Sequence, residues 1–168
     1  MKRARRVALA KRLAAATGAA GAAAAVLAVA STGATAASNH GKVGATITVK
    51  GQTKDVIAVT VGKVEDPVLA YGANPGMRVI GIDVTVKNVG HVKYSDSPGG
   101  FVSTSDGEIS TSLITGSGPC NPPATIKLAP GQQKSFCLPF QIEKSGKLAF
   151  IQYETDSGYG TPAVFALK

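Results

Sequence analysis

The sequence predicts an all-β protein, an antiparallel β-sandwich of seven to nine short strands joined by Greek-key connections. Three observations lead to this fold class. The chain has no tryptophan and is rich in valine, isoleucine and threonine, a composition typical of strands. Apolar and polar residues alternate with a period of two in short runs, and glycine, proline and aspartate separate these runs. No helical period follows residue 36.

The clearest strand is RVIGIDVTVKN, residues 78–88, in which apolar residues at even positions alternate with Gly81, Asp83, Thr85 and Lys87. Such alternation indicates a sheet with one side in water. Asp106-Gly107 predicts a tight hairpin between two further strands, because glycine accepts the positive φ of such turns. The other strands are predicted at residues 45–50, 56–64, 101–105, 108–115, 124–128, 135–142, 147–154 and 163–167.

The N-terminal segment has the three parts of a secretory signal peptide. Residues 1–12 contain six basic residues and no acidic residue, residues 13–30 are uncharged, and Ala34-Thr35-Ala36 is a small-x-small cleavage site. We therefore predict cleavage after Ala36 and secretion, with no membrane span left. The mature chain would have a flexible tail over residues 37–44 and one sandwich domain over residues 45–168. An uncleaved membrane anchor is the alternative, but alanine and glycine partition weakly into lipid.

Most of the positive charge belongs to this segment. The whole chain has 18 lysine and arginine residues against 10 aspartate and glutamate residues, a net charge of +8. Without the signal peptide, twelve basic and ten acidic residues remain, a net charge of +2, with no run of basic residues. Nucleic acid is therefore not an expected partner. Arg5-Arg6 resembles a twin-arginine signal, but the residues after it match that signal poorly, which favours the general secretory route.

Both cysteines, Cys120 and Cys137, lie in the stretch PCNPPATIKLAPGQQKSFCLPF, residues 119–140. Two thiols in a small exported domain most often form a disulfide, which here would attach a loop to the face of a sheet. A metal site is the alternative, but zinc usually takes four Cys and His ligands at short spacing. Neither His40 nor His91 forms a short-spaced pair with a cysteine.

Three acidic residues of the stretch SDSPGGFVSTSDGE, namely Asp96, Asp106 and Glu108, are candidate calcium ligands. Hard cations take carboxylate and carbonyl oxygens, and this stretch is rich in both. The alternative is that Asp96 and Asp106 accept hydrogen bonds from the backbone of their own turns.

The loop VLAYGANPGM offers Tyr71 and Met77 as candidate binding residues, because exposed apolar residues on the loops of a sandwich often contact a partner. The alternative is that Tyr71 packs beneath its own loop.

No catalytic residue and no cofactor are predicted. Gly116-Ser117-Gly118 lacks the spacing of a G-x-S-x-G nucleophile elbow. A triad around His91 could be drawn with many serines and aspartates, so it carries no weight.

Several of these segments together resemble the DUF4352 family of secreted bacterial immunoglobulin-like domains. The resemblance rests on VIGIDVTVKNVG, on Phe101 followed by SDGE, on LAPGQQKSFCLPFQI and on IQYETDSGYG, and it covers about residues 42–160. These match a V-x-V-x-V-x-N-x-G strand, a DG hairpin and an L-x-P-G turn that are shared in the family. The resemblance implies an immunoglobulin-like sandwich outside the cytoplasm, and it brings no catalytic residues.

The function expected from the sequence is therefore a non-enzymatic binding or structural module of the bacterial cell envelope or medium. It would recognise a protein or glycan partner through loops on a disulfide-linked sandwich. The second expectation is a calcium- or small-ligand-binding protein that uses the region from Asp96 to Glu108. A hydrolase is the third.

Overall fold

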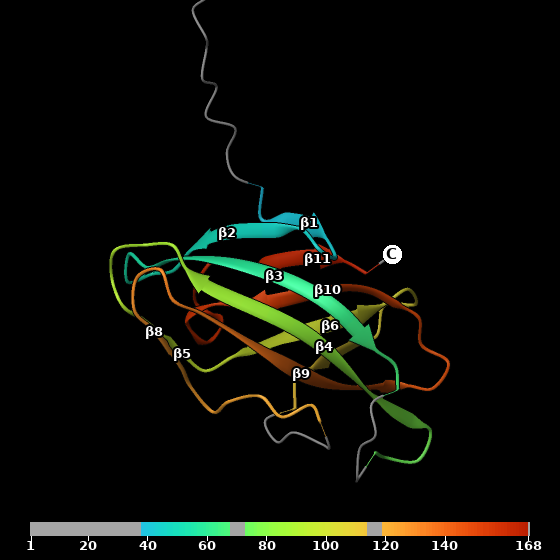
Figure 1. The fold of residues 1–168 in the computed structure, drawn as a ribbon. Helices are drawn as coiled ribbons and strands as arrows, with labels where there is room; N and C mark the ends of the chain where they lie inside the picture. Colours follow the sequence, from blue (N-terminus) through green and yellow to red (C-terminus); the bar gives the residue numbers. More distant parts are fainter. Residues whose placement is uncertain (1–37, 68–72, 114–118, 168) are drawn as a thin grey trace, which may run out of the picture. The chain divides into compact units, whose positions relative to one another are not determined.

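The structure is a computed structural model of the chain, and it describes residues 38–67, 73–113 and 119–167. It consists of two larger sheets and one small sheet (Figure 1). The five-stranded sheet has the order β1 (His40–Lys42), β11 (Ala163–Ala166), β10 (Leu148–Glu154), β6 (Gly99–Thr104), β7 (Ile109–Thr111). The four-stranded sheet has the order β2 (Thr46–Lys50), β3 (Val56–Glu65), β4 (Met77–Asn88), β9 (Gln133–Glu143). The small sheet pairs β5 (Tyr94–Asp96) with β8 (Ile126–Leu128).

The connections are of the Greek-key type. The chain forms β2, β3 and β4 in one sheet, passes to β6 and β7 in the other, returns to place β9 beside β4, and finally passes to β10 and β11. Every pair is antiparallel except β1 with β11. The predicted fold class, an antiparallel β-sandwich with Greek-key connections, is confirmed. In the described residues the strands number eleven, and all nine of the predicted strands are among them.

Strands β1 and β5 are the two that the sequence did not predict. The stretch 37–44 was expected to be a flexible tail, but His40–Lys42 pair in register with β11. The backbone N–H of Val164 donates to Asn39 O at 2.8 Å, and that of Val43 donates to Ala166 O at 3.2 Å. Main-chain hydrogen bonds hold this strand, so it needs no alternation of apolar side chains.

The core lies between the two larger sheets, and β4 shows why. Its residues at positions 80, 82, 84 and 86 are completely buried, whereas Asp83 and Lys87 are exposed, as the alternation predicted. The β5–β8 pair adds three buried side chains to the same core. The cluster of fully buried apolar residues in the middle of the four-stranded sheet comprises Ile57, Val59, Val61, Ile80, Ile82, Val84, Val86, Leu138, Phe140 and Ile142.

Both lateral sides of the sandwich are bridged between the sheets. On one side β1 leads into β2 through a turn in which the N–H of Gly44 donates to Val61 O at 2.8 Å. On the other side Ser112 forms an isolated bridge with Phe140, and the N–H of Leu113 donates to Pro139 O at 2.8 Å. The outermost strands of the two sheets are therefore connected by main-chain contacts.

Candidate functional site

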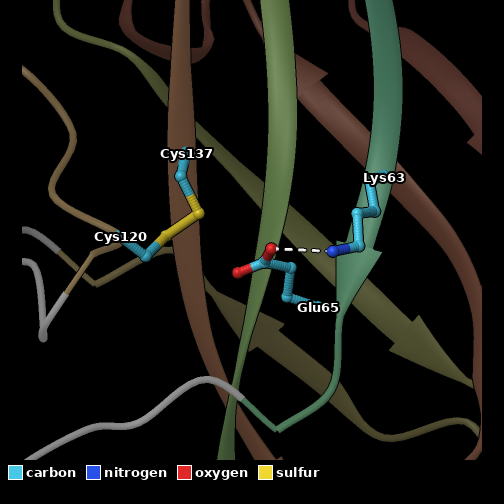
Figure 2. The surroundings of a disulfide bond; sticks show 4 residues. All are labelled: Lys63, Glu65, Cys120 and Cys137. Atoms are coloured by element: carbon cyan, nitrogen blue, oxygen red, sulfur yellow. Dashed lines mark hydrogen bonds and ion pairs between the residues drawn. A yellow bond between two sulfur atoms is a disulfide. The ribbon is translucent and has the colours of Figure 1, made fainter.

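The two cysteines are joined, as the sequence predicted. Cys120 Sγ and Cys137 Sγ form a disulfide whose Cα atoms are 5.0 Å apart (Figure 2). Cys137 lies in β9 opposite Asp83 of β4, and Asp83 faces outward, so the bond attaches the segment before β8 to the outer face of the four-stranded sheet. The disulfide therefore does not cross the core, and this arrangement also agrees with the prediction.

A hollow of about 540 Å³ lies beside the disulfide on this outer face. Its floor comes from neighbouring strands, because Asp83 and Thr85 of β4 stand opposite Cys137 and Ser135 of β9. Pro119, next to the disulfide, contributes to the lining on the far side from β3. This volume lies within the range of ligand sites in proteins.

A β-bulge in β3 leaves room for the hollow. The register of β3 against β4 shifts between Val61 and Val64, and the two residues inside the shift, Gly62 and Lys63, both line the hollow. A Cβ placed on Gly62 would lie 3.5 Å from the Cβ of Asp83, an ordinary contact. Glycine at this position therefore keeps open a space that a side chain could occupy without a clash.

The groups around the hollow are polar but carry little net charge. Lys63 Nζ lies 3.0 Å from Glu65 Oε1, and Figure 2 shows this ion pair on the same face of the sheet as the disulfide. Both side chains are well exposed, so the pair contributes little to stability. Asp83 is exposed and has no ion pair among the described residues.

A row of hydroxyl groups crosses the sheet to the hollow. Thr46, Thr60, Thr85 and Ser135 are consecutive partners on the four strands. Their hydroxyls are hydrogen-bonded in two pairs, each at 2.7 Å, one between Thr46 and Thr60 and one between Thr85 and Ser135. Each hydroxyl can donate one hydrogen bond and accept others, so the row keeps free capacity for a polar ligand.

The structure does not bring the three predicted calcium ligands together. Asp96 ends β5 before the start of β6, whereas Asp106 and Glu108 lie beyond the other end of β6. The length of β6 is about 20 Å at the usual rise of a strand, which is too far for shared coordination. Among the described residues, no group of three Cys, His, Asp or Glu side chains is placed to hold a metal.

Asp96 instead accepts hydrogen bonds from neighbouring residues. It is buried, and its Oδ2 accepts a hydrogen bond from the hydroxyl of Tyr94 at 2.9 Å. Its Oδ1 accepts from the N–H of Ser97 and from both the N–H and the hydroxyl of Ser157. Burial, with a contribution from the charge of Asp96, raises the pKa of Tyr94 and that of the neighbouring Tyr153. The carboxylate thus joins the small sheet to the turn after β10.

Asp106 serves its own hairpin, which was the alternative considered for it. Hydrogen bonding to the side chain of Thr104 lowers the pKa of Asp106, and Gly107 follows with a φ of +92°. Glu108 is half-buried on the same hairpin, and its Oε2 has no hydrogen-bond partner in the part of the chain that the structure describes.

The remaining candidates lie outside the hollow or outside the described residues. Met77 begins β4, half-buried, with its N–H donating to Asn74 O at 3.0 Å. Tyr71 and Ser117 lie outside the described residues. His40 is exposed in β1, and His91 is exposed in the turn after β4.

Asp83, Thr85 and Ser135 were not singled out from the sequence. Alternation places Asp83 and Thr85 on a polar face, but only the register between β4 and β9 brings them beside Ser135 and Cys137. That register joins residues that are about fifty positions apart, and no local pattern specifies it.

Comparison with known proteins shows a likeness in fold alone. No protein-family model matches the chain and no curated protein sequence matches it, so the resemblance to the DUF4352 family rests on the strand and turn motifs. Among solved structures, the secreted protein MPT63 of Mycobacterium tuberculosis superimposes with a TM-score of 0.60 at 17% identity. The match covers 76% of this chain and 95% of MPT63. The yjhA protein of Bacillus subtilis gives a TM-score of 0.53 at 17% identity, over 76% of this chain and 98% of yjhA.

Both likenesses show that the β-sandwich is a fold found in bacterial proteins of similar length. In the described part of the chain, no helix has the length and apolar character that a bilayer crossing requires.

Proposed function

We propose that the chain is an exported, non-enzymatic binding module and that its ligand is a neutral glycan held in the hollow beside the disulfide. The observation that carries this proposal is the lining of the hollow, which combines Asp83, Lys63, Thr85 and Ser135 around a space of about 540 Å³. A rigid sheet supplies the floor, and the disulfide fixes the segment that contains Pro119.

The chemistry of this lining suits hydroxyl-rich ligands. Each sugar hydroxyl both donates and accepts, so it can donate to the Asp83 carboxylate, accept from the Lys63 ammonium, or do either with Thr85 and Ser135. Pro119 and the disulfide provide apolar surface for the C–H face of a sugar ring. A strongly charged ligand is less suitable, because the lining contains one acidic and one basic side chain, Asp83 and Lys63, and no cluster of either sign.

Binding without hydrolysis is what this lining supports. Glycoside hydrolysis uses two carboxyl groups on opposite sides of the scissile bond. Asp83 is the sole acid among the described residues that line the hollow.

Export is part of the same proposal. It is supported by the signal-peptide pattern that ends at Ala36, by the disulfide, which persists in oxidising compartments, and by the fold shared with a protein described as secreted. Membership of the DUF4352 family is proposed on the strand and turn motifs. Intact mass tests the export step. The exported chain should begin at Ala37, and its cysteines should be alkylated only after reduction.

The binding test is calorimetry with neutral oligosaccharides of the bacterial envelope, preceded by a glycan array that selects the probe. Asp83→Asn should weaken binding about 10- to 100-fold, because it replaces charge-assisted hydrogen bonds with neutral ones. Gly62→Leu should abolish binding, because the added side chain would extend into the hollow. The melting temperature should change little, because the new Cβ would be in ordinary contact with Asp83. Glu143→Gln is the matched control, since it removes an exposed carboxylate elsewhere on the sheet.

Two outcomes contradict the proposal. If no oligosaccharide binds but Gly62→Leu and Asp83→Asn both abolish capture of an envelope protein, the hollow is a protein-binding site. If a glycan binds equally well to both variants, the hollow is not the site.

A further inference from the structure

Two carboxylates from distant parts of the chain converge at one end of the sandwich. Asp55 ends the turn between β2 and β3, and Asp156 begins the 3₁₀ turn η1 (Asp156–Gly158) after β10. A Cβ placed on Gly51 would lie within 2.5 Å of both carboxylate oxygens of Asp55 and of Oδ2 of Asp156. Because all three oxygens lie within 2.5 Å of one point, no two of them are more than about 5 Å apart.

Asp55 is an unusual group to find in this place. Its side chain belongs to a residue that is 1% exposed, and its Oδ1 accepts a hydrogen bond from the hydroxyl of Thr53 at 2.6 Å. Its Oδ2 is buried and has no hydrogen-bond partner among the described residues. A buried carboxylate oxygen without a partner is strongly unfavourable, so this atom indicates that a positive group belongs beside it.

Asp156 presents a second negative charge to the same space. Its Oδ2 accepts a hydrogen bond from the N–H of Gln52 at 2.5 Å. The ion pairs of the described residues, Lys63 with Glu65 and Arg78 with Asp66, lie elsewhere. Two carboxylates at this spacing repel each other unless a cation or a proton lies between them.

From this geometry we infer a binding site for a divalent cation, calcium in chemical class, between Asp55 and Asp156. Calcium takes six to eight oxygen ligands at 2.3–2.6 Å and tolerates irregular geometry. The two aspartates supply carboxylate oxygens, and the oxygen of Thr155 is the next candidate. A Cβ on Gly160 would be 3.0 Å from Asp156 Oδ2 and would overlap Thr155 Oγ1, so these two oxygens are also close.

Water can complete the shell. A hollow of about 360 Å³ opens next to Gly51, Gln52 and Asp55, and it gives access from solvent. Lys50 and Lys54 also line this hollow, but neither forms an ion pair with the two carboxylates in the structure. Glycine at positions 51 and 160 leaves the space that the oxygens occupy, since a side chain at either would collide with them.

The cation would join two loops that already contact each other. Gln52 Nε2 donates to Tyr159 O at 2.6 Å, and the N–H of Thr161 reaches Lys50 O at 3.5 Å. Binding would therefore lock the turn between β2 and β3 to the connection between β10 and β11. This site shares no residue with the hollow beside the disulfide, so it can be tested independently of the proposed glycan site.

The test measures calcium binding and thermal unfolding of the exported protein after treatment with a chelator. Equilibrium dialysis should find one calcium ion per chain at free concentrations of about 0.1 to 1 mM, the range of extracellular modules. At about one hundred times the dissociation constant, calcium should raise the melting temperature by about 10 °C. Magnesium should give a smaller shift, because it requires octahedral geometry and gives up its waters reluctantly.

Asp55→Asn and Asp156→Asn should each abolish the calcium-dependent shift, whereas Asp106→Asn, at a distant exposed hairpin, should keep it. If Asp55→Asn does not fold, the test rests on the calcium-dependent shift of Asp156→Asn and on the dialysis of the unaltered protein. The inference is overturned if no calcium binds at about 10 mM, far above the range of extracellular modules. It is also overturned if the shift persists in both folded variants. A melting temperature that rises in Asp55→Asn, together with no effect of calcium on the unaltered protein, would also overturn the inference, because it would show that the two carboxylates repel each other with no cation between them.

Discussion

Replacing both cysteines by alanine is expected to lower the free energy of unfolding by about 3 kcal/mol, through the entropy of the unfolded chain. The disulfide joins residues that are 17 positions apart, so reduction releases a loop of modest length in the unfolded state. Alanine is chosen because Cys120 is 1% exposed, so a serine hydroxyl there would be a buried polar group. For a domain of about 130 residues this loss corresponds to a decrease of about 10 °C in melting temperature.

Urea and thermal unfolding, followed by circular dichroism, measure this loss. The unaltered protein in reductant should unfold at the temperature of the Cys120→Ala/Cys137→Ala variant, and the variant should not respond to reductant. This comparison separates the effect of the bond from the effect of the substituted side chains. A decrease of less than about 2 °C in both experiments would refute the reasoning, since it would mean that non-covalent contacts hold the segment before β8.

Three further predictions concern the body of the sandwich. Asn88→Ala should lower the free energy of unfolding in urea by about 2–4 kcal/mol. The reason is that the buried amide donates to Val92 O at 2.8 Å and to Leu128 O at 3.0 Å. A decrease of less than about 0.5 kcal/mol would contradict this prediction. Gly100→Ala should destabilise by about 1–3 kcal/mol, because its Cβ would overlap the carbonyl oxygen of Gln152. Gly99→Ala is the matched control, since its nearest neighbour would be at 3.7 Å, and equal effects of the two would refute the packing argument. Burial raises the pKa values of Tyr94 and Tyr153. The folded state therefore holds two protons that the unfolded chain releases above about pH 10. Their contribution to the free energy of unfolding is complete below that pH and falls above it by up to about 2.7 kcal/mol per pH unit. Tyrosinate absorbance from these two residues should appear only together with unfolding, and its appearance in the folded protein would contradict the prediction.

The sequence predicted nine of the eleven strands in the described residues, but it did not predict how the strands pair. Alternation located β4 because its apolar residues all enter one core, and it located β9 for the same reason. It missed β5, because Tyr94–Asp96 is too short to show a period, and β1, because pairing with β11 depends on main-chain groups.

Sites were harder to predict than strands, because they depend on register. Asp96, Asp106 and Glu108 are close in the sequence, yet β6 lies between the first residue and the other two. Asp55 and Asp156 are about one hundred positions apart, yet both contact the space above Gly51. The pairing of Cys120 with Cys137 could be predicted from the sequence, because two cysteines in a small exported domain most often form a disulfide.

The bridged lateral sides of the sandwich have a consequence for the behaviour of the protein in solution. An open edge strand recruits the edge of another molecule, and long exposed edges lead to polymeric β-assemblies. Here β1 passes the chain from one sheet to the other, and the bridge between Ser112 and Phe140 occupies the opposite margin. These contacts leave less of the outer strands free to pair with a second molecule, which would matter most if the chain accumulates outside the cell, as proposed.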